Sequence, residues 1–111
     1  MKTIEKNTIY KLANSDTLVA VMNANEDSEM AIAVPVVEAV PRERIVGEFD
    51  VNIDRVRHRF LMWSIIHIKY SDIGEPIAKM SPYAVVAMKN SASHILGLDE
   101  AEKSIPVADL C

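Results

Sequence analysis

Short segments rich in β-branched and aromatic residues dominate the first third of the chain. Turn-forming residues separate them, at 14–16 (NSD) and at 25–28 (NEDS). This pattern is typical of neighbouring strands in an antiparallel meander. The predicted strands cover residues 8–13, 17–23 and 30–36.

A hairpin is predicted in the middle of the chain. Residues 48–53 alternate polar and apolar side chains with the period of a strand, and after a charged turn the largely apolar run 57–66 follows. The second strand is therefore expected to be buried and central, with Trp63 in the core. His67 alternates with isoleucines and is expected to face outward. Pro35 should lie at a strand end or edge, because it has no N–H for a ladder.

The period changes to that of a helix after residue 80. Ser81 stands in N-cap position, Pro82 in the first helical position and Gly97 at the C-terminal stop. One apolar face should dock on the sheet, formed by Val85, Met88, Ala92 and Ile95. The pattern predicts strands within about 8–70, a helix over about 82–96, a domain over 1–98 and a short acidic tail over 99–111.

Length and charge limit the function classes. The chain has 111 residues, which is the size of one domain, and a net charge of -4, which disfavours direct nucleic-acid binding. The run from Phe60 is broken by polar residues and is too short for a membrane span. The first residues show no leader sequence, so a cytoplasmic protein is expected.

Five arginines depart from the acidic balance: Arg42, Arg44, Arg55, Arg57 and Arg59. Clusters of charge at turns commonly form solvated surfaces, so the simplest interpretation is a solvated hairpin turn.

Motifs for catalysis or metal binding are scarce. The sequence has three glycines and no phosphate-binding loop, no HExxH motif, and a single cysteine, Cys111. His58, His67 and His94 fall on three different predicted elements, and Glu75 is expected to be a lone loop carboxylate. No cofactor and no metal are predicted, and the composition favours a binding module.

Several stretches resemble the CcdB family of plasmid toxins, which poison DNA gyrase. From residue 49 to 98 the chain is similar to that family without a gap, through "DVNI", "RFLMWSII", "IGEPIAKMS" and "ILGL", and "AVPVVEA" is similar to a stretch in its first half. The matching positions are Val51, Ile53, Arg59, Gly74, Glu75, Ala78, Ser81 and Gly97.

The resemblance implies a small SH3-like barrel of the CcdB/MazF type that is a non-enzymatic homodimer. Its implied partners are the gyrase A subunit and a cognate antitoxin. The target-binding residues would be Ala92, Leu96, Gly97 and Leu98, although Leu96 replaces the tryptophan of the family, and such a loss weakens an interface by about 2 kcal/mol. The dimer interface is assigned to Ile65, Ile68 and Met88, because so small a barrel leaves apolar surface uncovered.

Two alternatives remain. The first is a MazF-like endoribonuclease toxin on the same fold, using Arg57 or Arg59 together with Ser64. The second is a diverged CcdB-fold protein with another protein target.

Overall fold

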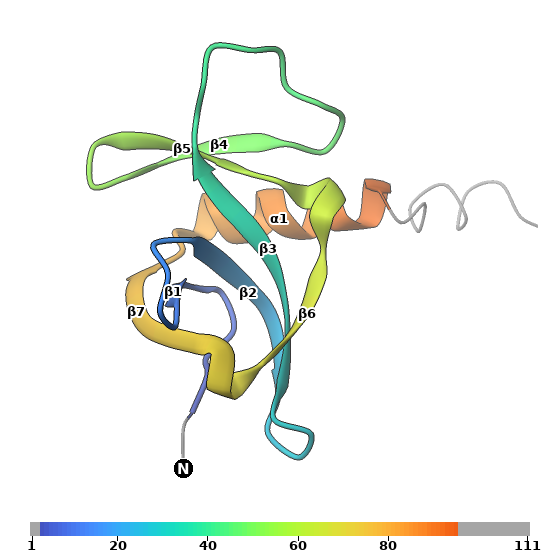
Figure 1. Ribbon diagram of the computed structural model, residues 1–111. Coiled ribbons are helices and arrows are strands. Elements are labelled where there is room, and N and C mark those ends of the chain that lie inside the picture. The colour runs from blue at the N-terminus through green and yellow to red at the C-terminus, as the bar shows by residue number, and fades with distance from the viewer. Residues whose placement is uncertain (1–2, 96–111) are drawn as a thin grey trace, which may run out of the picture.

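Seven strands and one helix form the part of the chain, residues 3–95, that the computed structural model describes (Figure 1). The strands are β1 (Thr8–Leu12), β2 (Leu18–Asn25), β3 (Met30–Glu38), β4 (Phe49–Ile53), β5 (Val56–Phe60), β6 (Ile66–Lys69) and β7 (Ile73–Lys79). Two 3-10 turns, η1 (Met62–Ser64) and η2 (Tyr70–Asp72), flank β6, and helix α1 covers Pro82–Ile95. The predicted mainly β fold with one C-terminal helix is confirmed. The predicted tail, 99–111, lies outside the described residues.

The strands form one antiparallel sheet in the order β4-β5-β3-β2-β1-β7. The sixth strand, β6, pairs with the first half of β3, whereas β5 pairs with its last three residues. Figure 1 shows the consequence: β3 runs through the middle of the molecule, with β6 along its lower part and the β4–β5 hairpin across its upper end. On this side, β3 therefore changes its partner strand from β6 to β5 along its length.

That change of partner divides the predicted strand 57–66. The chain pairs with β3 as β5, leaves the sheet at η1 and pairs again as β6. Pro35 lies within β3, opposite this break, and its carbonyl accepts a hydrogen bond from the Leu61 N–H at 3.0 Å. Because proline has no N–H, it can only accept there. The prediction that Pro35 marks a strand end or edge was wrong: the partner strand, and not β3, is interrupted.

The segment around Glu75, predicted to be a loop, is strand β7 at one edge of the sheet. Among the described strands it pairs only with β1, through a register with two irregularities, and an edge strand tolerates Pro76. Gly74 allows the close approach, because a Cβ there would lie 2.7 Å from the Lys11 carbonyl oxygen. Long-range pairing thus overrides the loop composition.

The helix begins as predicted. The Ala84 N–H donates to Ser81 Oγ at 3.2 Å, and Pro82 is the first helical residue. The side chains of Ala84, Met88 and Ala92 are buried against the sheet, whereas Val85 is only half-buried. The face that docks is therefore rotated slightly from the predicted one. No helix among residues 3–95 is long and apolar enough to cross a membrane.

Two clusters of buried side chains form the interior. One, centred on Tyr10, Val19 and Ile73, fills the space between β1, β2, β6 and β7, and the other, centred on Phe60, Met62 and Met88, lies under α1. Met88 is 1% exposed and Ile68 is 8% exposed within a single chain. The premise that these two side chains leave apolar surface for a dimer contact was wrong, because the domain's own core covers them.

Candidate functional site

The β4–β5 hairpin has one apolar and one polar face. Phe49 and Phe60 lie opposite each other and their rings stack at 4.6 Å on the core side. Strand alternation puts the next side chains on the other face. These are two pairs of directly opposed residues, Asp50 with Arg59 and Asn52 with Arg57.

The first polar pair is a bidentate ion pair, here called the hairpin ion pair. Arg59 donates from Nε to Asp50 Oδ1 at 2.8 Å and from Nη2 to Oδ2 at 3.2 Å. Its remaining nitrogen, Nη1, donates to the carbonyls of Val40 and Arg42 at 3.3 and 3.4 Å. The hydrogen bonds from Arg59 to the Asp50 carboxylate, together with the positive charge of Arg59, lower the pKa of Asp50, although its burial opposes this. Because Arg59 is buried, the interpretation of this arginine as part of a solvated turn was wrong.

A second bidentate pair holds the loop between β3 and β4, and is called the loop ion pair. Both terminal nitrogens of Arg42 donate to Glu48 at 2.9 Å. The carboxylate also accepts from the Ile45 N–H at 2.8 Å and from Trp63 Nε1 at 2.6 Å. The hydrogen bonds from Arg42, and then those from Trp63 and Ile45, lower the pKa of Glu48 to about 2 although burial opposes this.

Trp63 was predicted to be a core residue, and this was wrong. Its side chain is 51% exposed and reaches Glu48 from η1. The indole ring therefore covers the buried carboxylate from outside and leaves much of its apolar surface on the protein exterior.

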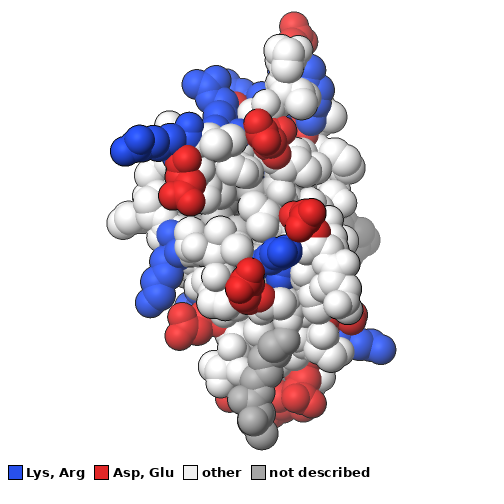
Figure 2. All heavy atoms as spheres, turned by 60° about the vertical axis from the view of Figure 1, so that its left-hand side comes forward, with Lys and Arg blue, Asp and Glu red and all other residues white. Residues whose placement is uncertain are grey.

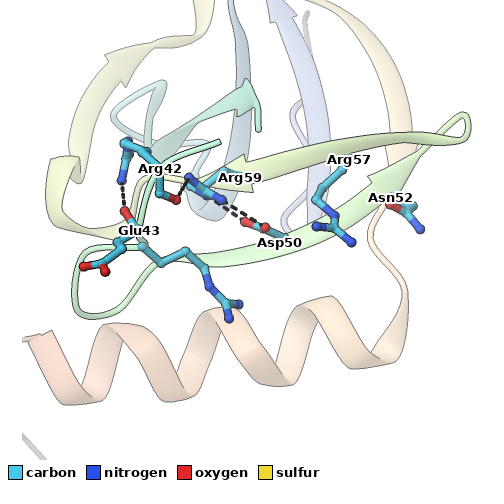
Figure 3. A pocket seen from close by; sticks show the side chains of 7 residues that line it. Arg42, Glu43, Asp50, Asn52, Arg57 and Arg59 are labelled. Atoms are coloured by element: carbon cyan, nitrogen blue, oxygen red, sulfur yellow. Dashed lines mark hydrogen bonds and ion pairs between the residues drawn. The ribbon is translucent and has the colours of Figure 1, made fainter. Parts of the chain in front are cut away.

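An open hollow of about 770 Å³ lies over the polar face of the hairpin (Figure 3). Arg57 and Arg44 make no hydrogen bond or ion pair within residues 3–95, unlike Arg42 and Arg59. Figure 3 shows Arg57 beside the Asp50–Arg59 pair and Asn52 nearer the hairpin tip. The hollow, called the arginine hollow, is lined by Arg42, Glu43, Arg44, Asp50, Asn52, Arg57 and Arg59.

Charge is unevenly spread over the outside of the molecule. In Figure 2, basic side chains are most numerous toward the upper end, at the height of the hairpin in Figure 1, although others lie at mid-height and near the lower right, and acidic ones are distributed from top to bottom. The arginine hollow, lined by four arginines and two carboxylates, is a local excess of positive charge on a chain whose net charge is -4. Such a surface is suited to an anionic group that two free guanidinium groups can contact.

The structure brings together some of the predicted site residues and separates others. Arg57 and Arg59 share the hollow, but Ser64 does not line it and lies on η1. Ala92, predicted to bind a target, is 8% exposed because it packs into the core under α1. The other three predicted target-binding residues, Leu96, Gly97 and Leu98, lie outside the described residues.

Sequence reasoning missed the carboxylates and the amide of this site. The signal was present: Asp50 and Asn52 are two residues apart, as are Arg57 and Arg59, on both sides of a short turn. In a two-residue hairpin these four positions share one face. In contrast, nothing in the local pattern links Trp63 with Glu48. Among residues 3–95, no three His, Cys, Asp or Glu side chains are placed to hold a metal ion.

Comparison with known proteins shows the fold. No protein-family model matches the sequence, and no curated protein does. Similar solved structures include an endoribonuclease in complex with its cognate antitoxin from Mycobacterial species, with a TM-score of 0.73, 12% identity, and coverage of 86% of this chain and 97% of that one. A second endoribonuclease from Mycobacterial species has a TM-score of 0.73, 12% identity, and coverage of 87% and 94%. The Mycobacterium tuberculosis toxin MazF-mt6 has a TM-score of 0.66, 13% identity, and coverage of 81% and 96%.

These similarities confirm the predicted small barrel-like fold of the MazF/CcdB type. They contradict the identification of the chain as a CcdB-family gyrase poison, because the similar structures are endoribonucleases and a MazF toxin. The prediction of a non-catalytic protein that binds the gyrase A subunit was wrong for the same reason.

Proposed function

We propose that this chain is an endoribonuclease toxin of the MazF type that binds single-stranded RNA across the arginine hollow. The observation that carries the proposal is the pair of unengaged arginines, Arg44 and Arg57, beside the fixed hairpin ion pair. The likeness in fold to the Mycobacterial endoribonucleases supports it.

The acidic net charge does not oppose RNA binding at this place. At physiological ionic strength, charges are screened over about 8 Å, so the local groups decide what approaches the hollow. Four arginines and two carboxylates line the hollow, and two of the arginines, Arg44 and Arg57, make no ion pair within residues 3–95. The expectation of no nucleic-acid contact rested on the sum over the chain, which does not describe this surface.

The hollow also contains a group that can accept a proton. Glu43 lines it, and no hydrogen bond or ion pair within residues 3–95 engages its carboxylate, although its carbonyl accepts from Arg42 Nη1 at 2.7 Å. In the proposed reaction the ribose 2′ oxygen bonds to the adjacent phosphorus and its proton passes to Glu43. The bond from phosphorus to the 5′ oxygen breaks, and that oxygen takes a proton from solvent.

Arg57 is assigned to the phosphate. In this proposal its guanidinium stabilises the negative charge that develops on the phosphate oxygens while the 2′ oxygen attacks, and a donor in this role contributes about a hundredfold to a rate. Arg59 is a positioning residue, because four of its five N–H donors are taken up by Asp50 and two carbonyls. Ser64, the hydroxyl considered from the sequence, has no part in this arrangement.

The test compares two arginines of one hairpin. Purified wild-type protein should cleave end-labelled single-stranded RNA into fragments with 2′,3′-cyclic phosphate and 5′-hydroxyl ends. Arg57→Ala should reduce the cleavage rate about a hundredfold, whereas Arg55→Ala, which removes an exposed arginine that does not line the hollow, should leave it unchanged. Circular dichroism checks that both variants fold. Intact RNA with the wild-type protein, or equal rates for the two variants, would overturn the proposal.

Two protein partners belong to this proposal. A cognate antitoxin is expected, because one similar endoribonuclease is solved in complex with its own. A homodimer is also retained, with its apolar contact placed on Ile45, Val46 and Trp63, whose side chains are 52%, 68% and 51% exposed. Sedimentation of the wild-type protein at micromolar concentration tests the dimer, and Val46→Glu should weaken it.

A further inference from the structure

A second hollow adjoins the first one at the hairpin tip. It lies between the end of the β4–β5 hairpin and the segment that leads from β7 into α1, and its volume is about 210 Å³. Its lining combines apolar and polar residues. The apolar ones include Val51, Ile53, Ile77 and Met80, and the polar ones include Asp54 and Ser81. This space is called the hairpin–helix cleft.

Asn52 lines both the arginine hollow and the hairpin–helix cleft. Figure 3 shows its side chain at the hairpin tip, close to the chain entering α1. The side chain is exposed, and within residues 3–95 its amide makes no hydrogen bond. An amide offers two donors and one acceptor that is able to take two bonds. The hollow lies on the polar face of the hairpin and the cleft on its apolar face, so a ligand that extends from one into the other would pass around the edge strand β4, beside Asn52.

The cleft is suited to a flat, largely apolar group and not to a phosphate. The Ala84 N–H, which could hold an anion at the start of α1, is already bonded to Ser81 Oγ. Among residues 3–95, no arginine lines the cleft, and Lys79 is its one basic residue. Its volume lies below the roughly 300–1,000 Å³ of sites for drug-sized molecules, so it has room for a ring system but not for a whole nucleotide.

The turn that forms one wall is held in an unusual backbone conformation. Asp54 and Arg55 both have positive φ, 52° and 68°, as a two-residue turn of type I′ requires. This turn fixes the end of the hairpin that borders the cleft.

We propose that the hairpin–helix cleft binds one base of the RNA whose phosphate lies in the arginine hollow. This rests on the proposed function and adds a subsite to it. The base enters between Ile53 and Ile77, and the amide of Asn52 bonds its edge, which is how proteins recognise unstacked bases of single-stranded RNA. The cleft thereby selects which base lies next to the cleaved bond.

Nuclear magnetic resonance tests the subsite without requiring cleavage. The full-length protein, labelled with nitrogen-15, is titrated with the four ribonucleoside 5′-monophosphates and, as a control without a base, with ribose 5-phosphate. At least one nucleotide should shift the amide signals of cleft residues such as Ile77 and Ala84, whereas ribose 5-phosphate should shift only those around Arg57. Shifts confined to the arginine hollow for every nucleotide would overturn the proposal.

Two variants separate the cleft from the hollow. Asn52→Ala should lower the affinity for the preferred nucleotide about tenfold and reduce the difference in affinity between the four nucleotides. Ile77→Trp, at an exposed position on β7, should fill the cleft and abolish its shifts while those around Arg57 remain. Unchanged affinity in both variants would contradict the assignment.

Cleavage assays then distinguish the two proposals. If RNA is cleaved with a base preference that Asn52→Ala removes, both hold. If RNA is cleaved with no preference at the adjacent position, the subsite is wrong and the nuclease stands. If base-dependent shifts appear at the cleft but RNA stays intact, the cleft binds a base and the proposed cleavage is wrong.

Discussion

The loop ion pair and the hairpin ion pair join the same two kinds of group in opposite surroundings. In the loop ion pair the carboxylate is the buried partner: the side chain of Glu48 is 0% exposed and that of Arg42 is 39% exposed. In the hairpin ion pair the arginine is buried more deeply, with Arg59 at 7% and Asp50 at 15%. Their geometry alone, bidentate and near 3 Å in both, does not distinguish them.

The difference in burial matters because it decides how much stability is lost when one residue of an ion pair is replaced. A charge that stays buried without its counterpart destabilises the fold strongly, whereas an exposed one returns to water. Within residues 3–95, Arg59 has only two long hydrogen bonds, both to carbonyls, besides those to Asp50. Glu48 has two short ones from neutral donors besides Arg42. The buried charge of the loop ion pair would thus keep two short hydrogen bonds if its partner were removed, whereas the buried charge of the hairpin ion pair would keep only the two long ones.

The largest effect is expected from removing Asp50. Asp50→Ala leaves the buried guanidinium of Arg59 unpaired and should lower the free energy of unfolding by about 3–4 kcal/mol. Arg59→Ala should cost less, because Asp50 borders the open hollow and regains water. Urea unfolding at pH 7, followed by circular dichroism, measures both. Equal losses would show that burial of the remaining partner does not control the energy of this pair.

The contribution of the loop ion pair to stability should be lost at low pH. The pKa of Glu48 is about 2 in the folded state against its ordinary value of 4.5, so this carboxylate stabilises the fold above pH 4.5 and stops doing so as the pH falls through 2. The difference in pKa corresponds to about 3 kcal/mol, lost between about pH 5 and pH 2. Urea unfolding over this range should show it. Glu48→Gln is the control.

In that control, the part of the pH dependence due to Glu48 must disappear, while the part due to Asp50, whose pKa is also lowered, remains. If wild-type protein and Glu48→Gln lose stability in parallel between pH 5 and pH 2, the assignment to Glu48 is incorrect.

A smaller effect should come from the neutral donor of the loop ion pair. Trp63→Phe keeps an aromatic ring over Glu48 but removes the Nε1–H that donates at 2.6 Å, and should cost about 1–1.5 kcal/mol because hydrogen bonds to charged groups are stronger than neutral ones. Thermal unfolding followed by circular dichroism measures it. Tyr83→Phe, at a side chain that is 67% exposed, is the matched control. A loss as small as in that control would mean that Arg42 alone holds Glu48.

Local patterns determined much of this protein. Alternation predicted the hairpin whose polar face carries the candidate site, and Ser81 with Pro82 correctly marked the start of α1. These features depend on residues that are neighbours in the sequence, so the spacing of side chain and backbone groups is already set by the strand or helix itself.

Only the tertiary structure decided which of these residues are buried and which remain available. Arg57 and Arg59 are equivalent in the sequence pattern, yet Arg59 is covered by the carbonyls of Val40 and Arg42, 19 and 17 residues away. Trp63 was expected inside and lies outside, since its partner Glu48 is 15 residues away and belongs to a loop. Contacts between residues so far apart in the sequence depend on the way β3 pairs first with β6 and then with β5. The local hydrophobic pattern does not predict this pairing.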